Sequence, residues 1–114
     1  MIKGTFKRNA ADQIISFEVS GHANTGPYGS DIVCAAVSAL TFSTVNGVVA
    51  LAGFTPIVSI DNDDEGYLYC EMITEITDEQ SNTAQILLEN LLLGLKDIQQ
   101  EYSDVIEIIT LTKK

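Results

Sequence analysis

Two residues of this chain could together perform nucleophilic chemistry: Cys34 and His22, the only histidine. Cys34 lies near the start of a long apolar helical pattern, where the helix dipole and unpaired backbone N–H groups favour a thiolate. His22 could take the thiol proton and later give it to a leaving amine. The loop between them is rich in glycine and could fold the two side chains into contact. Such a pair is the minimum for cysteine nucleophilic catalysis.

Each residue also has a plain structural interpretation. A free cysteine is commonly a small buried residue, and a loop histidine is commonly a surface group. The loop between them could be a lid that closes over a substrate or simply a surface connection. Its residues that could contact a substrate are Gly26, Pro27, Tyr28 and Gly29. The spacing of Gly21, Gly26 and Gly29 does not match a phosphate-binding loop.

Three neighbours could complete such a site. Backbone N–H groups around Cys34 could stabilise the oxyanion of a tetrahedral intermediate. Asp31 could be the N-cap of the helix or could orient His22, and the N-cap is the favoured role. Ser38 lies one turn after Cys34 and could hydrogen-bond within the site, although packing is favoured for so small a residue.

Other polar residues predict neither a metal site nor a cofactor. The acidic run around Asp61, Asp63, Glu65 and Gly66 resembles the start of a calcium loop, but its twelfth position is Met72, where a glutamate is needed. We interpret it as a hairpin turn. Cys70 lies in a strand pattern and is expected in the core, and one histidine with two cysteines is too few for structural zinc.

The composition indicates a single folded domain over residues 1–114, with 46% hydrophobic residues. The net charge of −10 disfavours nucleic acid and anionic lipid and favours basic partners. Two irregularly spaced cysteines and an N-terminus without a signal-peptide pattern predict a cytoplasmic protein. The uncharged run from Ile32 to Gly53 is long enough to span a membrane. Its internal polar residues, and the absence of Lys or Arg at its ends, favour a helix buried in the domain or in a subunit interface.

Hydrophobic periodicity predicts an α+β fold in the order β-β-α-β-β-α-β, with both helices packed on one mostly antiparallel sheet. The expected strands are 2–8, 13–19, 56–61, 67–76 and 105–112, and the expected helices are 31–52 and 78–102. Gly53 suits the end of the first helix, which could be broken near Asn46-Gly47. Thr77 and Gln80 have capping-box spacing. The apolar stripe of the second helix comprises Ile86, Leu87, Leu91, Leu95 and Ile98.

The segment GHANTGPYGSDIVCAAVS, residues 21–38, resembles the signature of the ribosomal-processing cysteine proteases, the Prp family. That signature has a Gly-His pair, a short loop containing glycine, and then Asp-Ile-Val-Cys-Ala-Ala-Val-Ser. The resemblance is specific here and extends more weakly to the rest of the chain through size, acidity and element order.

The resemblance implies a Cys-His endopeptidase with Cys34 as nucleophile, His22 as base, and contributions from Gly21, Asp31 and Ser38. It implies removal of a short N-terminal extension from protein twenty-seven of the large ribosomal subunit, with cleavage after two phenylalanines. It also implies a homodimer, a flexible loop over the active site and no cofactor. The acidity of this chain would suit a basic ribosomal protein.

Two other functions remain open at this point. The chain could be a ribosome-associated binding module that docks a basic peptide without catalysis, with Cys34 in the core. It could also be a redox sensor in which Cys34 is the reactive thiol.

Overall fold

The computed structural model describes residues 1–21, 30–61 and 66–112, and of Ser30 and Asp31 the backbone only. Its helices and strands follow the predicted order. They are β1 (Ile2–Arg8), β2 (Ile14–Ser20), α1 (Ser30–Gly47), a π-helical turn η1 (Val48–Ala52), β3 (Ile57–Asp61), β4 (Tyr67–Glu71), α2 (Asp78–Glu101) and β5 (Ile106–Thr112). The predicted α+β class is confirmed.

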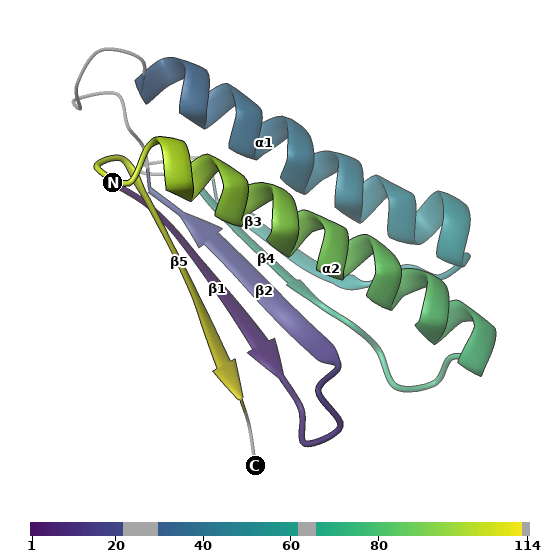
Figure 1. Cartoon of the computed structure of the whole chain (residues 1–114). Helices are drawn as coiled ribbons and strands as arrows, with labels where there is room; N and C mark the ends of the chain where they lie inside the picture. The colour runs from purple at the N-terminus through teal and green to yellow at the C-terminus, as the bar shows by residue number, and fades with distance from the viewer. Residues whose placement is uncertain (22–29, 62–65, 113–114) are drawn as a thin grey trace.

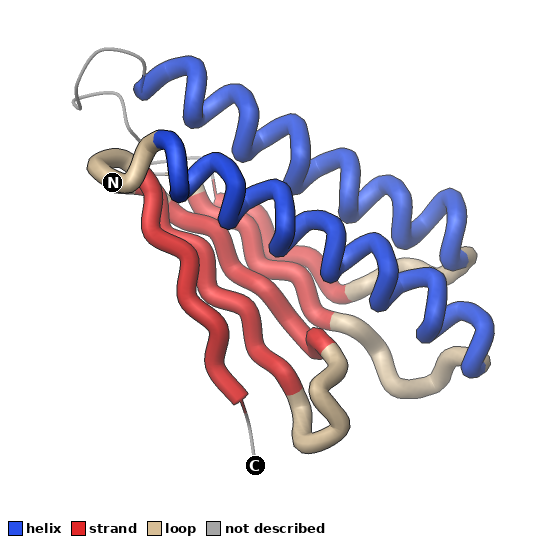
Figure 2. Tube along the Cα trace, in the orientation of Figure 1, coloured by secondary structure: helices blue, strands red, loops and turns tan. Residues whose placement is uncertain are grey.

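The strands form one five-stranded sheet in the order β3-β4-β2-β1-β5. Every neighbouring pair is antiparallel except β1 and β5, which are parallel. Both helices lie on the same face of this sheet, side by side and running in opposite directions (Figures 1 and 2). The sheet therefore has one face covered by helices and one open face.

The main core lies between the covered face and the helices. Register places Phe6 opposite Phe17, and Phe17 opposite Cys70, so these side chains form one row across three strands. The Phe6 and Phe17 rings stack with their centroids 5.5 Å apart. Leu88, Leu91 and Leu95 of α2 are buried against the same core. The apolar face of α2 therefore packs on the sheet.

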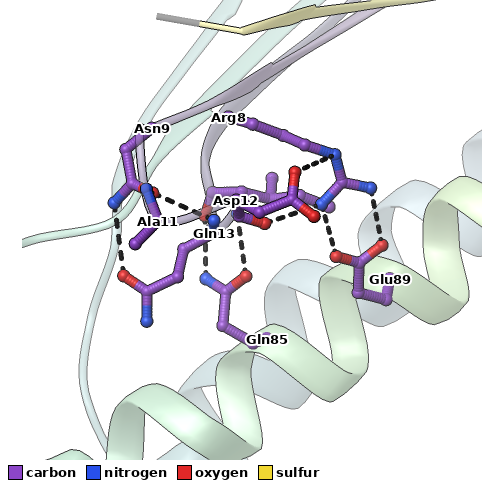
Figure 3. A network of polar contacts seen from close by, with 8 residues as sticks. Arg8, Asn9, Ala11, Asp12, Gln13, Gln85 and Glu89 are labelled. Carbon is purple, nitrogen blue, oxygen red and sulfur yellow. Dashed lines mark hydrogen bonds and ion pairs between the residues drawn. The ribbon is translucent and has the colours of Figure 1, made fainter. Parts of the chain in front are cut away.

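A polar network joins the β1–β2 hairpin to α2 (Figure 3). The Arg8 guanidinium donates two hydrogen bonds to the Glu89 carboxylate, at 2.5 and 2.9 Å. Gln85 accepts from the N–H of Ile14 and donates to its carbonyl oxygen, both at 2.8 Å. Gln85 thus bonds both backbone polar groups of Ile14, and together with the Arg8–Glu89 pair it ties the hairpin to the helix.

The ends of the helices follow the predicted signals. Thr77 and Gln80 form the expected capping box at the start of α2. The first helix changes to π-helical hydrogen bonding after Gly47, next to the predicted break. Gly53 ends it with a φ of 82°, a left-handed conformation that favours glycine.

Two expectations were wrong in detail. The fourth strand ends at Glu71 rather than at residue 76. Ile86 was assigned to the core stripe of the second helix, but its side chain is 70% exposed. The period of 3.6 residues places Ile86 about half a turn away from the buried Leu88, Leu91 and Leu95, on the opposite side of α2.

The apolar run of the first helix is not buried within this chain. Within the described residues, Ile32–Ala52 is one helix whose length and composition would suffice to cross a membrane, yet only 28% of its most apolar window is buried. Val33, Val37 and Val48 face the core, while Ile32 and Leu51 are exposed. Of the two soluble interpretations, burial inside the domain is wrong for most of this helix, and a subunit interface stays a prediction.

Candidate active site

Gly21 follows the end of β2, and its backbone conformation requires glycine. Its φ is 96°, and a Cβ atom there would lie 2.3 Å from the Met1 carbonyl oxygen. The N–H of Gly21 donates to the carbonyl oxygen of Gly66 at 3.1 Å, just before β4. Gly21 therefore fixes where the chain leaves the sheet. His22 follows directly in the sequence and lies outside the described residues, as do Gly26, Pro27, Tyr28 and Gly29.

Cys34 lies near the N-terminal end of α1, at the side of the core. Its neighbour Val33 and the next-turn residue Val37 are both buried and hold this part of the helix against the sheet. Cys34 itself is a free thiol of intermediate exposure that packs on the edge of the core. Its placement thus combines a fixed backbone with a side chain that solvent and ligands can reach.

A cavity of about 360 Å³ opens at this point. Its lining includes both Gly21 and Cys34, so the structure brings together two parts of the residue 21–38 segment. The rest of the lining is mostly apolar and comes from α1 and four strands: Ile2, Val19, Ala35, Val37, Ser38, Thr41, Phe42, Ile60, Gly66, Tyr67 and Leu68. A volume of this size is at the lower end of the range for ligand pockets, about 300–1,000 Å³. It suits amino-acid side chains.

The start of α1 decides which backbone N–H groups near Cys34 could bind an oxyanion. An α-helix leaves its first four N–H groups without an intrahelical partner, and α1 begins at Ser30. Counted from the residue that flanks the helix, those groups end at Ile32, so the N–H of Cys34 lies two residues beyond them. The available donors are therefore those of the turn preceding Cys34, and they remain close to its side chain because helical side chains tilt toward the N-terminus.

The two remaining motif residues have different outcomes. Ser38 is exposed and lines the cavity, so its hydroxyl is available to a bound group, and its role stays a prediction. Asp31 is the second residue of α1 rather than the residue flanking it. Its side chain lies outside the described part of the chain, and whether it caps the helix or orients His22 stays a prediction.

Cys70 has the environment of an inert thiol. It is fully buried in the core, as expected, and burial raises its pKa to about 12. Among the residues that the structure describes, no three His, Cys, Asp or Glu side chains gather as metal ligands. Two residues of the calcium-like acidic turn, Asp63 and Glu65, fall in the undescribed range 62–65.

The sequence did not point to Phe42, Thr41 or Ile60 as part of a site, yet all three line the cavity. One signal was available. Cys34, Ser38 and Phe42 recur every four residues, which places them on one flank of a helix. Ile60 could not be found in this way because the sheet brings it from a distant part of the chain.

The fold is that of a family of cysteine proteases. The profile of a family described as cysteine protease Prp matches residues 1–107. The chain therefore belongs to the Prp family of cysteine proteases. This membership favours the enzyme over the binding module and the thiol sensor.

Curated relatives cover nearly all of the chain. The ribosomal processing cysteine protease Prp of Bacillus subtilis is 40% identical over 110 residues, 96% of this chain and 97% of its own length. The corresponding protein of Staphylococcus aureus is 33% identical over 100 residues, 88% of this chain and 90% of its own. These two proteins carry ribosomal processing in their names.

Solved structures share the fold. A Streptococcus mutans protein aligns with a TM-score of 0.88 at 35% identity, covering 99% of this chain and 96% of its own. The ribosomal processing protease Prp of S. aureus, solved with a covalently linked product peptide, aligns with a TM-score of 0.79 at 28% identity. That alignment covers 96% of this chain and 99% of the other. The sheet topology and helix placement are thus those of Prp structures.

Proposed function

We propose that this protein is an endopeptidase that removes the short N-terminal extension of a basic protein of the large ribosomal subunit, protein twenty-seven, by cutting after a Phe-Phe pair. The observation that carries the proposal is that Cys34 and Gly21 line one apolar cavity. Gly21 brings the chain to this cavity one residue before His22. A nucleophile and its base can thus approach the same bound peptide.

In the proposed reaction, His22 accepts the proton of the Cys34 thiol and the sulfur attacks the carbonyl carbon of the scissile bond. Free N–H groups of the first turn of α1 stabilise the oxyanion. The C–N bond breaks, and His22 gives its proton to the leaving amine. Water then attacks the thioester carbon, with His22 taking a proton from it, and the released sulfur recovers that proton. No cofactor enters this sequence.

The proposed substrate rests on three supports. The relatives that cover most of this chain are named as ribosomal processing proteases, and those of S. aureus were solved with peptides bound. An apolar cavity beside Cys34 suits phenylalanine side chains. The net charge of −10 favours association with a basic ribosomal protein.

The same proposal places the enzyme in the cytoplasm, where ribosomes assemble, as a homodimer without direct contacts to nucleic acid or membrane. The exposed apolar side of α1 and η1 is the proposed dimer surface, because it carries no charge from Ile32 to Gly53 in a strongly acidic chain. Gly26, Pro27, Tyr28 and Gly29 are proposed to contact the substrate, and Asp31 and Ser38 to support the site.

The test is cleavage of the full-length ribosomal protein and of a synthetic peptide that spans its Phe-Phe site. Wild type should cut both after the second Phe, whereas Cys34→Ala, Cys34→Ser and His22→Ala should lose cleavage. Cys70→Ala is the matched control, since it removes the other thiol without touching the cavity, and it should cut after any loss of stability is accounted for. Cleavage by Cys34→Ala, or none by wild type on either substrate, would refute the proposal.

A further inference from the structure

Cys34 lies at one end of an apolar hollow that continues along α1 and the edge strand β3. Cys34, Ser38 and Phe42 follow one another at intervals of four residues on the same flank of α1, and all three line the cavity. Ile60 of β3 lines it as well. The hollow therefore has a defined direction, from the candidate nucleophile toward Phe42.

Phe42 and Ile60 are large apolar residues that line the cavity, yet about half of each side chain is exposed. Ile60 is paired with Leu68, so both point to the helix-covered face of the sheet. Leu68 is buried there, but Ile60 is 47% exposed, because β3 is the last strand and α1 does not cover it completely. Phe42 is 45% exposed. Two large apolar side chains thus face a hollow with no side chain of the described residues filling the space between them.

The spacing along the helix sets which part of a peptide could fill this space. Phe42 is two turns beyond Cys34, a rise of about 12 Å at about 1.5 Å per residue. An extended peptide advances about 3.3 Å per residue. A substrate with its scissile bond at Cys34 would therefore bring a side chain about three or four positions away to Phe42.

We propose that Phe42 and Ile60 form a specificity subsite that binds an apolar side chain at the third or fourth position on the acyl side of the scissile bond. This inference rests on the proposed function. We assign the acyl side because that part of the substrate stays bonded to Cys34 after the leaving amine has gone, and a remote contact would hold the thioester in place for attack by water. The subsite adds a requirement beyond the two phenylalanines.

The test is a peptide series with a constant Phe-Phe pair in which Leu or Ala occupies each position from the third to the fifth on the acyl side and from the first to the fourth on the other. Wild type should prefer Leu over Ala at the third or fourth acyl-side position by about tenfold in kcat/KM, as expected for burying a few methylene groups. The preference should fall to about twofold or less in Phe42→Ala and in Ile60→Ala. Phe42→Leu should retain most of it.

Ile109→Ala is the matched control: this residue is also a half-exposed apolar group, but it lies on β5, the opposite edge strand of the sheet. The Ile109→Ala variant should prefer Leu over Ala at the same position as strongly as wild type does. Three results would overturn the subsite while cleavage itself stands. The preference for Leu over Ala could occur only on the leaving side, it could be absent beyond the Phe-Phe pair, or it could persist in Phe42→Ala. A change of oligomeric state in Phe42→Ala with an unchanged preference would assign Phe42 to a subunit interface instead. If no peptide and no full-length substrate is cut, the proposed function fails and the subsite with it.

Discussion

The N–H of Gly21 donates to the carbonyl oxygen of Gly66 at 3.1 Å, and this bond joins the end of β2 to the start of β4 beside the cavity that holds Cys34. Both glycines have positive φ angles, 96° and 66°. At the candidate site, β2 ends and β4 begins next to two glycines in left-handed conformations, and one hydrogen bond joins these glycines. The position from which the chain continues to His22 depends on this arrangement.

Gly21→Ala should lower stability and activity together. A Cβ atom would meet the Met1 carbonyl oxygen, and alanine is strained at this φ, so we expect a loss of about 1–3 kcal/mol in the free energy of unfolding. Because the backbone must shift to relieve the overlap, peptide cleavage should fall more than the folded fraction does. Denaturant titration and cleavage rates measured on the same preparation would show both effects.

Gly53→Ala is the control for that variant. Gly53 also has a positive φ, but it ends η1, and the nearest atom to an added Cβ is the Gln80 side-chain nitrogen at 3.7 Å. Its substitution should cost about 1 kcal/mol and leave cleavage per folded molecule unchanged. Equal losses of specific activity in the two variants would contradict a local role for Gly21.

The two thiols should react at very different rates. Cys34 borders the cavity, whereas Cys70 is fully buried and burial raises its pKa to about 12. Iodoacetamide at pH 7 to 9 should therefore modify Cys34 alone in the native protein, and both thiols in denaturant. Peptide mass spectrometry would locate the label. Labelling of native Cys70 at a rate comparable to Cys34 would contradict the described core.

The Arg8–Glu89 pair should give an acid-dependent contribution to stability. The hydrogen bond from Arg8 lowers the pKa of Glu89 below its usual value of 4.5. A lowered carboxylate pKa in the folded state stabilises above the unfolded pKa, and the contribution is lost as pH falls through the folded pKa. Glu89→Gln should thus cost about 1 kcal/mol or less at pH 7, because solvent screens the half-exposed carboxylate, and progressively less below about pH 4.

Urea denaturation at several pH values would measure this difference. Glu75→Gln is a suitable control, since Glu75 is an exposed acidic residue and its removal changes net charge by the same amount. A wild-type advantage over Glu89→Gln that stays constant down to pH 2, or one matched by Glu75→Gln, would show that the pair is not its source.

A charge on the exposed side of the first helix should disrupt the proposed homodimer. Leu51 is 70% exposed at the end of η1, and Ala39 is exposed in the middle of α1. Leu51→Lys and Ala39→Lys should convert a dimer to a monomer in sedimentation velocity, because an unpaired charge would be buried at the interface. Ile86→Lys on α2 is the matched control. A dimer that survives both helix variants and dissociates with Ile86→Lys would place the interface on α2.

The fold was largely predictable because its signals are local. Alternation defined the strands, the capping box at Thr77 defined the start of α2, and Gly53 defined the end of the first helical run. The register and strand order could not be predicted, since the pairing of β1 with β5 joins the two ends of the chain. Ile86 was assigned to the stripe although the helical period places it opposite Leu88 and Leu91. The exposure of the first helix could not be decided from the sequence, because an apolar run does not say whether this chain or another copy covers it.

The candidate site divides in the same way. Cys34, Gly21 and Ser38 belong to one continuous segment, and the structure places all three around one cavity. The opposite wall, with Ile60 and Leu68, comes from strands distant in sequence and had no local signal. The side chain of Asp31 and all of residues 22–29 fall outside the described part of the chain, and the roles of Asp31 and His22 stay predictions.

The most direct test of the central claim is covalent capture by a substrate-like electrophile. A peptide ending in Phe-Phe, whose last carbonyl carries a chloromethyl group in place of the leaving amine, would alkylate a nucleophile held at that carbonyl and release chloride. We expect one adduct by intact mass, located on Cys34, lost in Cys34→Ala, retained in Cys70→Ala and slowed by competing uncleaved substrate. Adduct formation on Cys70, or none on Cys34 while the peptide substrate is being cut, would contradict it.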